Sequence, residues 1–276
     1  MKQEKEPESL LVDHEINLIK PEVVSFQHKD GKPVWAGLYK PAKQHPNRPA
    51  LLDIHGGGYR QFSREGWSVY GYAKHLNKIN YFVQQGYTIL DLDCRGGSGF
   101  GRDYRTDIYR FMGIKDVESG LAGTDYLIKE HNINPEKIGV YDISYGGFFT
   151  LMPLFKHPGF FAAGVANAAF SDWAHYCYLW TSRILNLPFD DPKAYEILSP
   201  INYAAGLEDP LLIVHGLIDD NVHFQDAARL THKLIELEKP FEVMYYPKER
   251  HVIETQASRL DFHKRLSDFF KKHLLK

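Results

Sequence analysis

The chain has 276 residues, of which 43% are hydrophobic and 25% are charged. This composition is typical of a soluble globular protein with a sizeable core, and it argues against an intrinsically disordered chain. The 33 lysines and arginines nearly balance the 35 aspartates and glutamates, so the formal net charge of −2 argues against a general nucleic-acid binder. At about 100 to 200 residues per domain, the length alone allows one large domain or two small ones.

The cysteines and the N-terminal residues indicate the cellular compartment of the protein. Cys94 and Cys177 are too few for a disulfide framework and too far apart for a zinc or redox motif, so we expect reduced thiols. Residues 1–8 are charged and lack the apolar stretch of a signal peptide, and no later window approaches about 18 uninterrupted apolar residues. The sequence therefore predicts a cytoplasmic protein without a membrane partner, although a chain trimmed of its signal would read in the same way.

The N-terminal part predicts a short antiparallel hairpin. Strand-like residues 22–26 and 34–39 flank a polar segment in which Asp30-Gly31 is typical of a tight turn. The preceding residues, 1–20, are expected to form an N-terminal extension. A proline-rich link at 41–49 then leads into the rest of the chain.

The remaining apolar runs alternate with amphipathic stretches. Strands are predicted at 50–54, 87–92, 138–141, 164–166, 211–214 and 241–245, and helices at 117–129, 146–155, 224–238 and 260–275. This alternation predicts an α/β protein with a mostly parallel central sheet and helices on both faces. Two irregular excursions are expected, at 60–80 and at 170–202. Because no repeat or interdomain linker is visible, residues 1–276 are expected to form a single domain.

A possible nucleophile lies where the strand at 138–141 runs into the next helix. The segment Asp142-Ile-Ser144-Tyr-Gly146-Gly has the strand–turn–helix context of a nucleophile elbow, in which a strained serine sits between small residues. Gly146 fits that pattern, but Asp142 replaces the usual glycine. Read alone, the segment is equally compatible with an ordinary turn.

A glycine-rich segment upstream matches an oxyanion-hole loop. His55-Gly56-Gly57-Gly58 follows the predicted strand at 50–54, where backbone N–H groups can face a developing negative charge. The backbone N–H of Tyr145 would supply a second donor. The predicted oxyanion residues are therefore Tyr145, His55, Gly56 and Gly57, with a plain glycine-rich turn as the alternative.

The C-terminal third supplies an acid and a base in the chain order of an α/β hydrolase. Asp219 follows the strand at 211–214, and His251 lies in the loop after the strand at 241–245. Because the carboxyl ends of parallel strands meet at one edge of a sheet, these loops can converge on Ser144. We expect Ser144 as nucleophile, His251 as base and Asp219 as the acid that orients the base.

Four segments of the chain carry a family resemblance. They are Asp93–Arg105, Ser144–Gly147, His215–Gln225, and Tyr246–His251 together with Ser258–Phe262. Over about residues 20–275, the chain resembles the α/β-hydrolase domain of the prolyl oligopeptidase family of serine peptidases, especially its dipeptidyl-peptidase and acylaminoacyl-peptidase-like members. By motif position the resemblance implies the same three catalytic residues. It also implies that the N-terminal β-propeller, which normally screens substrates, has no room in this chain.

The resemblance places a substrate pocket in the aromatic run after residue 172. The implied pocket residues are Tyr145, Trp173, Tyr176, Trp180, Asn221 and Val222. Such rings make a flat apolar slot that accepts proline, alanine or an aryl group. The alternative is that these rings only pack the core. Without a propeller to hold a free amine, strict dipeptidyl-peptidase activity is not expected.

Three departures from the family pattern bear on activity rather than on fold. Asp142 puts a side chain where the elbow favours none, Val252 replaces the glycine that usually follows the histidine, and Pro153 lies inside the helix after Ser144. Proline there removes the hydrogen bond to the Phe149 carbonyl and can kink the helix.

No cofactor or metal is predicted. The glycines of Gly96–Gly101 do not have dinucleotide-binding spacing and no P-loop lysine follows them. The 14 histidines form no metal-ligand motif, and His215 and His223, on either side of Asp219, are expected to be structural.

The sequence therefore predicts a metal-independent serine hydrolase that cleaves short peptides or small acyl and aryl esters through an acyl-enzyme on Ser144. The alternative is a catalytically weakened α/β-hydrolase-fold binding module. A third reading is a catalytic domain excised from a longer parent. No nucleic-acid partner is expected, and self-association into a homo-oligomer is one way to cover a site without a propeller.

Overall fold

The sheet of the computed structural model, which describes residues 19–55, 59–62 and 73–276, has eight strands in the order β1-β2-β4-β3-β5-β6-β7-β8. The strands are β1 (Glu22–Gln27), β2 (Pro33–Tyr39), β3 (Ala50–Asp53), β4 (Thr88–Asp93), β5 (Ile138–Ile143), β6 (Ala163–Asn167), β7 (Leu211–Gly216) and β8 (Glu242–Tyr246). All eight match the runs predicted from the sequence to within two residues at either end.

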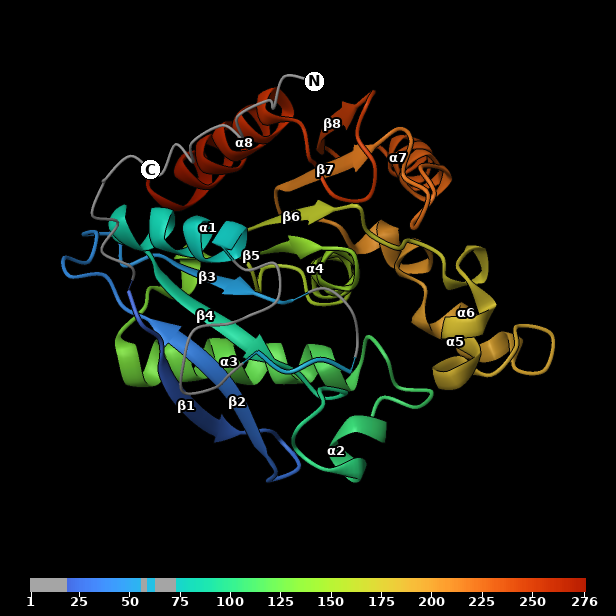
Figure 1. Cartoon of the computed structure of the whole chain (residues 1–276), viewed down its shortest axis with the longest axis horizontal. Coiled ribbons are helices and arrows are strands. Elements are labelled where there is room, and N and C mark those ends of the chain that lie inside the picture. The colour runs from blue at the N-terminus through green and yellow to red at the C-terminus, as the bar shows by residue number, and fades with distance from the viewer. Residues whose placement is uncertain (1–18, 56–58, 63–72) are drawn as a thin grey trace, which may run out of the picture.

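Most of the sheet is parallel. The pairs β1–β2 and β2–β4 are antiparallel, and every pair from β4 through β8 is parallel. The predicted hairpin is present, and Gly31 in its turn has a φ of 79°, which glycine adopts without strain. The parallel strands therefore end at one common edge, on the right of Figure 1.

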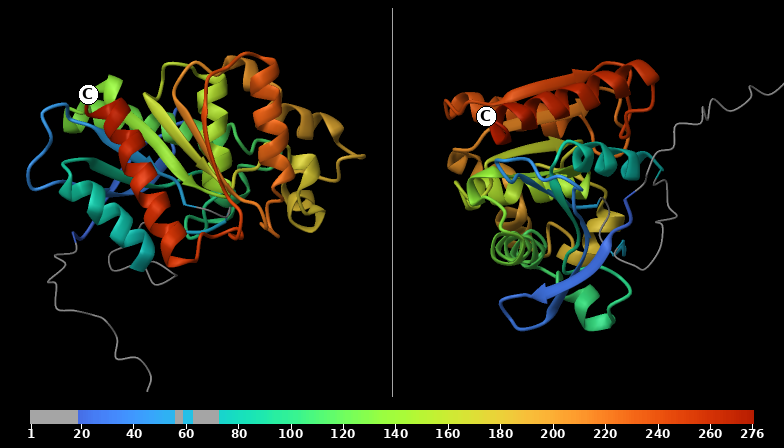
Figure 2. Two further views of the ribbon diagram at one scale, coloured as in Figure 1. Left: turned by 90° about the horizontal axis from the view of Figure 1, so that it is seen from above. Right: turned by 90° about the vertical axis from the view of Figure 1, so that its left-hand side faces the viewer.

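Long helices cover both faces of the sheet, as predicted for an α/β-hydrolase fold (Figure 1). One face carries α1 (Ala73–Gln84) and α8 (Gln256–Leu274), and the other carries α3 (Lys115–His131), α4 (Tyr145–Lys156) and α7 (Gln225–Glu236). Figure 2 shows α8 crossing the strands with α1 on the same face. Because both faces are covered, β4 and β7 are buried along their whole length.

The core forms two apolar clusters, one on each face of the sheet. Helix α4 is buried from Tyr145 to Phe155 and forms the centre of the larger cluster. Pro153 lies inside this helix, which nevertheless continues to Lys156. The turn that precedes α4 is therefore held by a deeply embedded helix.

The two segments predicted to be irregular contain helices. Residues 73–84 form α1, in which Ile79, Phe82 and Val83 pack on the sheet, whereas residues 63–72 lie outside the described part. The region after β6 holds α5 (Tyr178–Leu185) and α6 (Pro192–Leu198), which lie beyond the ends of the strands (Figure 1). A short helix, α2 (Arg102–Thr106), was also not predicted. Helices of five to eight residues show too few turns for an apolar periodicity to be recognised.

Candidate active site

Ser144 occupies a tight turn between β5 and α4. Its φ of 63° and ψ of −118° place a non-glycine residue in the left-handed half of backbone space, where strain is expected. A Cβ on Gly146 would lie 2.0 Å from the Ile54 carbonyl oxygen and 2.6 Å from the Asp142 Cβ, so only glycine fits there. This is the strained strand–turn–helix geometry predicted from the sequence, and Ser144 remains partly exposed.

The other two candidate catalytic residues meet at the sheet edge where β5 ends. His251 Nδ1 lies 2.9 Å from Asp219 Oδ2, in a pair that joins the loops after β8 and β7. Asp219 Oδ1 accepts the backbone N–H groups of Asn221 at 2.9 Å and Val222 at 3.0 Å. Burial by itself acts to raise the pKa of Asp219, but hydrogen bonds from His215, His251 and the backbone hold it well below its ordinary value. Asp219 is therefore a carboxylate at neutral pH.

The hydroxyl of Ser144 and the imidazole of His251, both in the described part of the chain, share no hydrogen bond. A nucleophile–base contact of this kind is often long without substrate and tightens in the bound complex. The geometry thus brings acid and base together and leaves the nucleophile nearby on the same edge of the sheet.

Two of the four predicted oxyanion residues are described. Tyr145 is the first residue of α4, so its backbone N–H is among those that a helix cannot satisfy internally. Its side chain has another role, because its hydroxyl donates to Asp116 Oδ2 at 2.5 Å. The His55 ring stacks on Phe62 and lies 3.1 Å from Asp93 through Nε2. Gly56 and Gly57 lie outside the described residues, so their part in the site stays a prediction.

The predicted pocket residues divide into a buried wall and an accessible rim. Trp173 and Val222 are each 0% exposed, which corrects the expectation that both present surface to a substrate. Trp173 instead packs between Phe148 and Phe170, and its ring stacks on Trp180 at 5.7 Å between centroids. Trp173 therefore packs behind the Trp180 ring, and neither Trp173 nor Val222 offers surface to a substrate.

The accessible rim consists of Tyr176, Trp180 and Asn221. The two rings pack edge to face at 5.8 Å between centroids, and the Tyr176 hydroxyl donates to Asn221 Oδ1 at 2.8 Å. Because Asn221 also follows Asp219 by two residues, this hydrogen bond ties the aromatic rim to the loop that carries the candidate acid. Tyr145 contacts the same group of rings from below, at 6.3 Å from Trp180.

A buried carboxylate that was not singled out in the sequence anchors the pocket segment. Asp226, in the first turn of α7, accepts hydrogen bonds from the Ser171 backbone and hydroxyl and from the Asp172 backbone, at 2.8 to 3.1 Å. Arg229, one turn further on, pairs with Asp172 at 2.8 Å. In the sequence, this contact could have been found from Asp226, a carboxylate on the apolar face of the helix predicted at 224–238.

The family model described as the prolyl oligopeptidase family matches residues 74–276. The chain belongs to the prolyl oligopeptidase family. It is 28% identical to mouse dipeptidyl peptidase 8 over 260 residues, and 27% identical to mouse prolyl endopeptidase FAP over 264 residues. Each alignment covers 92% of this chain but only 29% and 34% of those proteins. The crystal structure of Porphyromonas gingivalis dipeptidyl peptidase 4 superposes with a TM-score of 0.84 at 26% identity, over 93% of this chain and 36% of that one.

These comparisons confirm the predicted family and the predicted fold. The chain spans about a third of the length of these relatives. The match therefore concerns the unit that holds Ser144, Asp219 and His251, and the activity and substrates of the whole protein are left to proposal.

A buried lysine accompanies the aspartate that departs from the family elbow. Lys78 Nζ lies 2.7 Å from Asp53 Oδ2, 3.9 Å from Asp142 Oδ1 and 4.3 Å from the centre of the Tyr141 ring. Asp142 Oδ1 also accepts the backbone N–H of Ile143 at 2.7 Å. Burial acts to lower the pKa of Lys78, but the two carboxylates hold it above its ordinary value, so the ammonium stays charged.

Burial raises the pKa of the elbow aspartate, Asp142, well above its ordinary value, although Lys78 acts in the opposite direction. Lys78 comes from α1, a segment for which the sequence predicted no regular structure. Val252, the second departure, has 45% of its surface exposed, so its side chain faces solvent and does not crowd His251. With both departures present, His251 Nδ1 still lies 2.9 Å from Asp219 Oδ2.

Asp116 is a buried acid directly below the elbow. Burial raises its pKa to about 6, although hydrogen bonds from the Tyr145 hydroxyl and from backbone N–H groups act in the opposite direction. Its partner is the residue that follows the candidate nucleophile, so the carboxyl fixes the orientation of the Tyr145 side chain at the start of α4.

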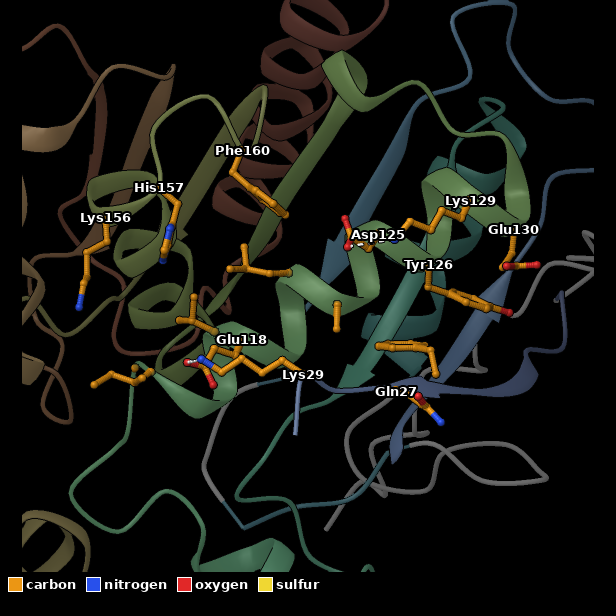
Figure 3. A pocket seen from close by; sticks show the side chains of 16 residues that line it. Gln27, Lys29, Glu118, Asp125, Tyr126, Lys129, Glu130, Lys156, His157 and Phe160 are labelled. Atoms are coloured by element: carbon orange, nitrogen blue, oxygen red, sulfur yellow. Dashed lines mark hydrogen bonds and ion pairs between the residues drawn. The ribbon is translucent and has the colours of Figure 1, made fainter. Parts of the chain in front are cut away.

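A cavity of about 750 Å³ lies away from this site, along α3. It is bordered by β1 and by the end of α4, and Figure 3 shows its charged rim, in which Lys29 pairs with Glu118. None of the candidate catalytic or pocket residues lines it. The described residues contain no cluster of three or more metal-ligating side chains, and none of their helices is both long and apolar enough to span a bilayer.

Replacing Lys78 by methionine is expected to lower the free energy of unfolding by about 3 to 5 kcal/mol, because it leaves the buried pair of Asp53 and Asp142 without the cation that Asp53 contacts at 2.7 Å. Urea denaturation at pH 7 measures this. Lys129→Met is the matched control: its exposed pair with Asp125 at 3.4 Å should contribute less than about 1 kcal/mol. Equal losses in the two variants would contradict the role assigned to Lys78.

Asp116→Asn is expected to flatten the pH dependence of stability. Because the native pKa is about 6 and the ordinary value is 3.8, the folded state holds this proton more tightly than the unfolded state does. The resulting stabilisation is complete below about pH 3.8 and is lost as the pH rises through about 6, at a total of about 3 kcal/mol.

Denaturation curves between pH 4 and pH 7 test this expectation. The wild type should lose about 2.4 kcal/mol more than Asp116→Asn over that range. The exposed Asp125→Asn variant should follow the wild type. A wild-type curve parallel to that of Asp116→Asn would show that Asp116 does not titrate in this window.

Proposed function

We propose that the chain is a serine hydrolase that cleaves short peptides or small acyl and aryl esters through an acyl-enzyme on Ser144. The observation that carries the proposal is the strained Ser144 at the end of β5, on the same sheet edge as the hydrogen-bonded pair of His251 and Asp219. That combination supplies a nucleophile, a base and an orienting acid from three separate loops.

In the proposed mechanism, His251 Nε2 takes the Ser144 proton as the oxygen attacks the carbonyl carbon. Asp219 holds the Nδ1–H of His251 at 2.9 Å and stabilises the imidazolium that forms. The backbone N–H of Tyr145 donates to the oxyanion. His251 then protonates the leaving amine or alcohol. Water, deprotonated by the same imidazole, attacks the acyl-enzyme and releases the acid.

The rim of Tyr176 and Trp180 supports an apolar residue or aryl group on the acyl side of the scissile bond. The two rings stand on the buried Trp173, which keeps them in place without itself reaching the substrate. Relatives named dipeptidyl peptidase and prolyl endopeptidase favour a peptide over an ester as the natural substrate. We propose a cytoplasmic location and a homo-oligomer as the sequence predicts.

The second candidate is a catalytically weakened binding module. The observation that favours it is that Ser144 and His251, in the described part of the chain, share no hydrogen bond. Fluorophosphonate labelling separates the two. A covalent adduct on Ser144 supports the enzyme, and an unlabelled but folded chain that binds a ligand saturably supports the module.

Ser144→Ala is expected to lower kcat by about 10⁴-fold or more on p-nitrophenyl acetate and on a short peptide amide, because no other group forms the acyl-enzyme. Intact mass after fluorophosphonate treatment should show one adduct on the wild type and none on the variant. Ser258→Ala, on the first turn of α8, is the control and should keep wild-type activity. Full activity of Ser144→Ala would disprove the mechanism.

Trp180→Ala is expected to reduce kcat/KM by about 10- to 100-fold for substrates with proline or an aryl group before the scissile bond, because half of the aromatic rim is removed. Hydrolysis of p-nitrophenyl acetate, whose acyl group is too small to fill the rim, should change little. If both substrates lose activity equally, Trp180 supports the fold and not the pocket.

A further inference from the structure

A second histidine faces the carboxylate of the candidate acid. His215 lies at the end of β7, is 1% exposed, and directs Nε2 to the Val222 carbonyl oxygen at 2.8 Å and to Asp219 Oδ2 at 3.3 Å. This is the same carboxylate oxygen that accepts His251 Nδ1 at 2.9 Å. Two imidazoles therefore share one oxygen of Asp219.

The contacts of His215 define its tautomer. Both neighbours of Nε2 are acceptors, a carbonyl oxygen and an ionised carboxylate, so Nε2 must carry the hydrogen. Nδ1 is buried and has no hydrogen-bond partner among the described residues. A proton on Nδ1 would create a buried donor and a buried charge without a partner, which is costly. His215 is therefore a neutral imidazole with a fixed Nε2–H.

The other polar groups around this contact have partners of their own. The Tyr176 hydroxyl, from the segment before α5, is bonded to Asn221, and Arg250 pairs with Asp220 on the surface. Glu249, in the loop after β8, accepts hydrogen bonds from Thr255 and from the backbone of Glu254.

His215 also has an aromatic neighbour. The Phe224 ring, just before α7, meets the His215 ring edge to face at 6.0 Å between centroids. Among the described side chains, His215 and His251 are thus the two that reach Asp219 Oδ2.

We propose that His215 is a positioning residue that holds the Asp219 carboxylate in the plane of His251 and withdraws part of its negative charge. The proposal rests on the proposed function, because it assigns His215 a role through Asp219 in the activation of Ser144. His215 itself does not touch the substrate. Three hydrogen bonds, from Asn221, Val222 and His251, hold the carboxylate, and His215 Nε2 lies 3.3 Å from the oxygen that His251 contacts.

Removing the Nε2–H donor is expected to shift the pH profile of activity in one definite direction. The negative charge on Oδ2 would then be shared with His251 alone, so the protonated form of His251 would be more stable. The acidic limb of the kcat/KM profile should move to higher pH, because a higher pH is needed to free the base. A loss of packing alone would lower activity or stability without moving that limb.

The test compares His215→Met, which keeps volume but has no donor, with His215→Gln, whose side-chain N–H₂ can replace Nε2–H. On p-nitrophenyl acetate, His215→Met should lower kcat by about 10- to 100-fold, the loss expected for a hydrogen bond to a charged group, with KM changed by less than about 3-fold. Its acidic limb should rise by about 0.5 to 1 pH unit. His215→Gln should restore the wild-type limb and most of kcat.

The nearby exposed His223→Met is the control and should match the wild type in both measurements. If the methionine and glutamine variants lose kcat equally and the acidic limb does not move, His215 contributes only packing. That result would overturn the proposal. Wild-type kcat and pH profile in His215→Met would overturn it as well.

Two measurements by NMR do not depend on turnover. Long-range ¹H–¹⁵N correlation on the wild type at pH 7 should show His215 as the Nε2–H tautomer, and an Nδ1–H tautomer would overturn the proposal. The titration midpoint of His251 should move to higher pH in His215→Met. If Ser144 proves unreactive while these shifts are observed, the proposed function fails and the role of His215 as the partner of Asp219 still holds.

Discussion

The close approach of α4 to the ends of β3 and β6 is the constraint on which the rest of the site depends. At Gly146 the helix lies so near the Ile54 carbonyl oxygen that a side chain has no space, and the Ser144 N–H donates to the Asn167 carbonyl oxygen at 2.9 Å on the opposite side. The chain can leave β5 only through a turn with positive φ at Ser144. Because α4 is buried along most of its length, the free energy of burying it offsets this strain. The hydroxyl is thereby held at the sheet edge.

Around this turn, three buried carboxylates are accommodated in three different ways. Burial and the neighbouring Asp53 raise the pKa of Asp142 well above its ordinary value, although the ammonium of Lys78 at 3.9 Å acts in the opposite direction. Asp219 is ionised because three hydrogen bonds and the nearby imidazole of His215 lower its pKa. At Asp116, burial outweighs the hydrogen bonds from the Tyr145 hydroxyl and from the backbone, and it raises the pKa to about 6. A carboxylate beside the elbow is thus not in itself a sign of a disabled site, because its neighbours decide its charge.

Much of the fold could be predicted from the sequence because it is coded locally. Each strand is a short apolar run bounded by polar or turn residues, and α3, α4, α7 and α8 are long enough to show a helical period. Helix α1 was not predicted, although Ile79, Phe82 and Val83 are buried, because the sequence there shows no recognisable signal for the start of a helix. The expectation for Trp173 also failed, since a ring that lines a pocket and a ring that supports one have the same sequence signature.

The sequence by itself determined the order of strands and helices, the family, and the candidate residues Ser144, Asp219 and His251, because these depend on local pattern and on chain order. Only the tertiary structure decided which groups share a charge or a proton. Lys78 meets Asp142, and His215 shares an oxygen of Asp219 with His251, because parallel strands and the helices on their faces bring distant segments to one edge. Such contacts depend on distances of a few ångströms between separate elements, which no local pattern records.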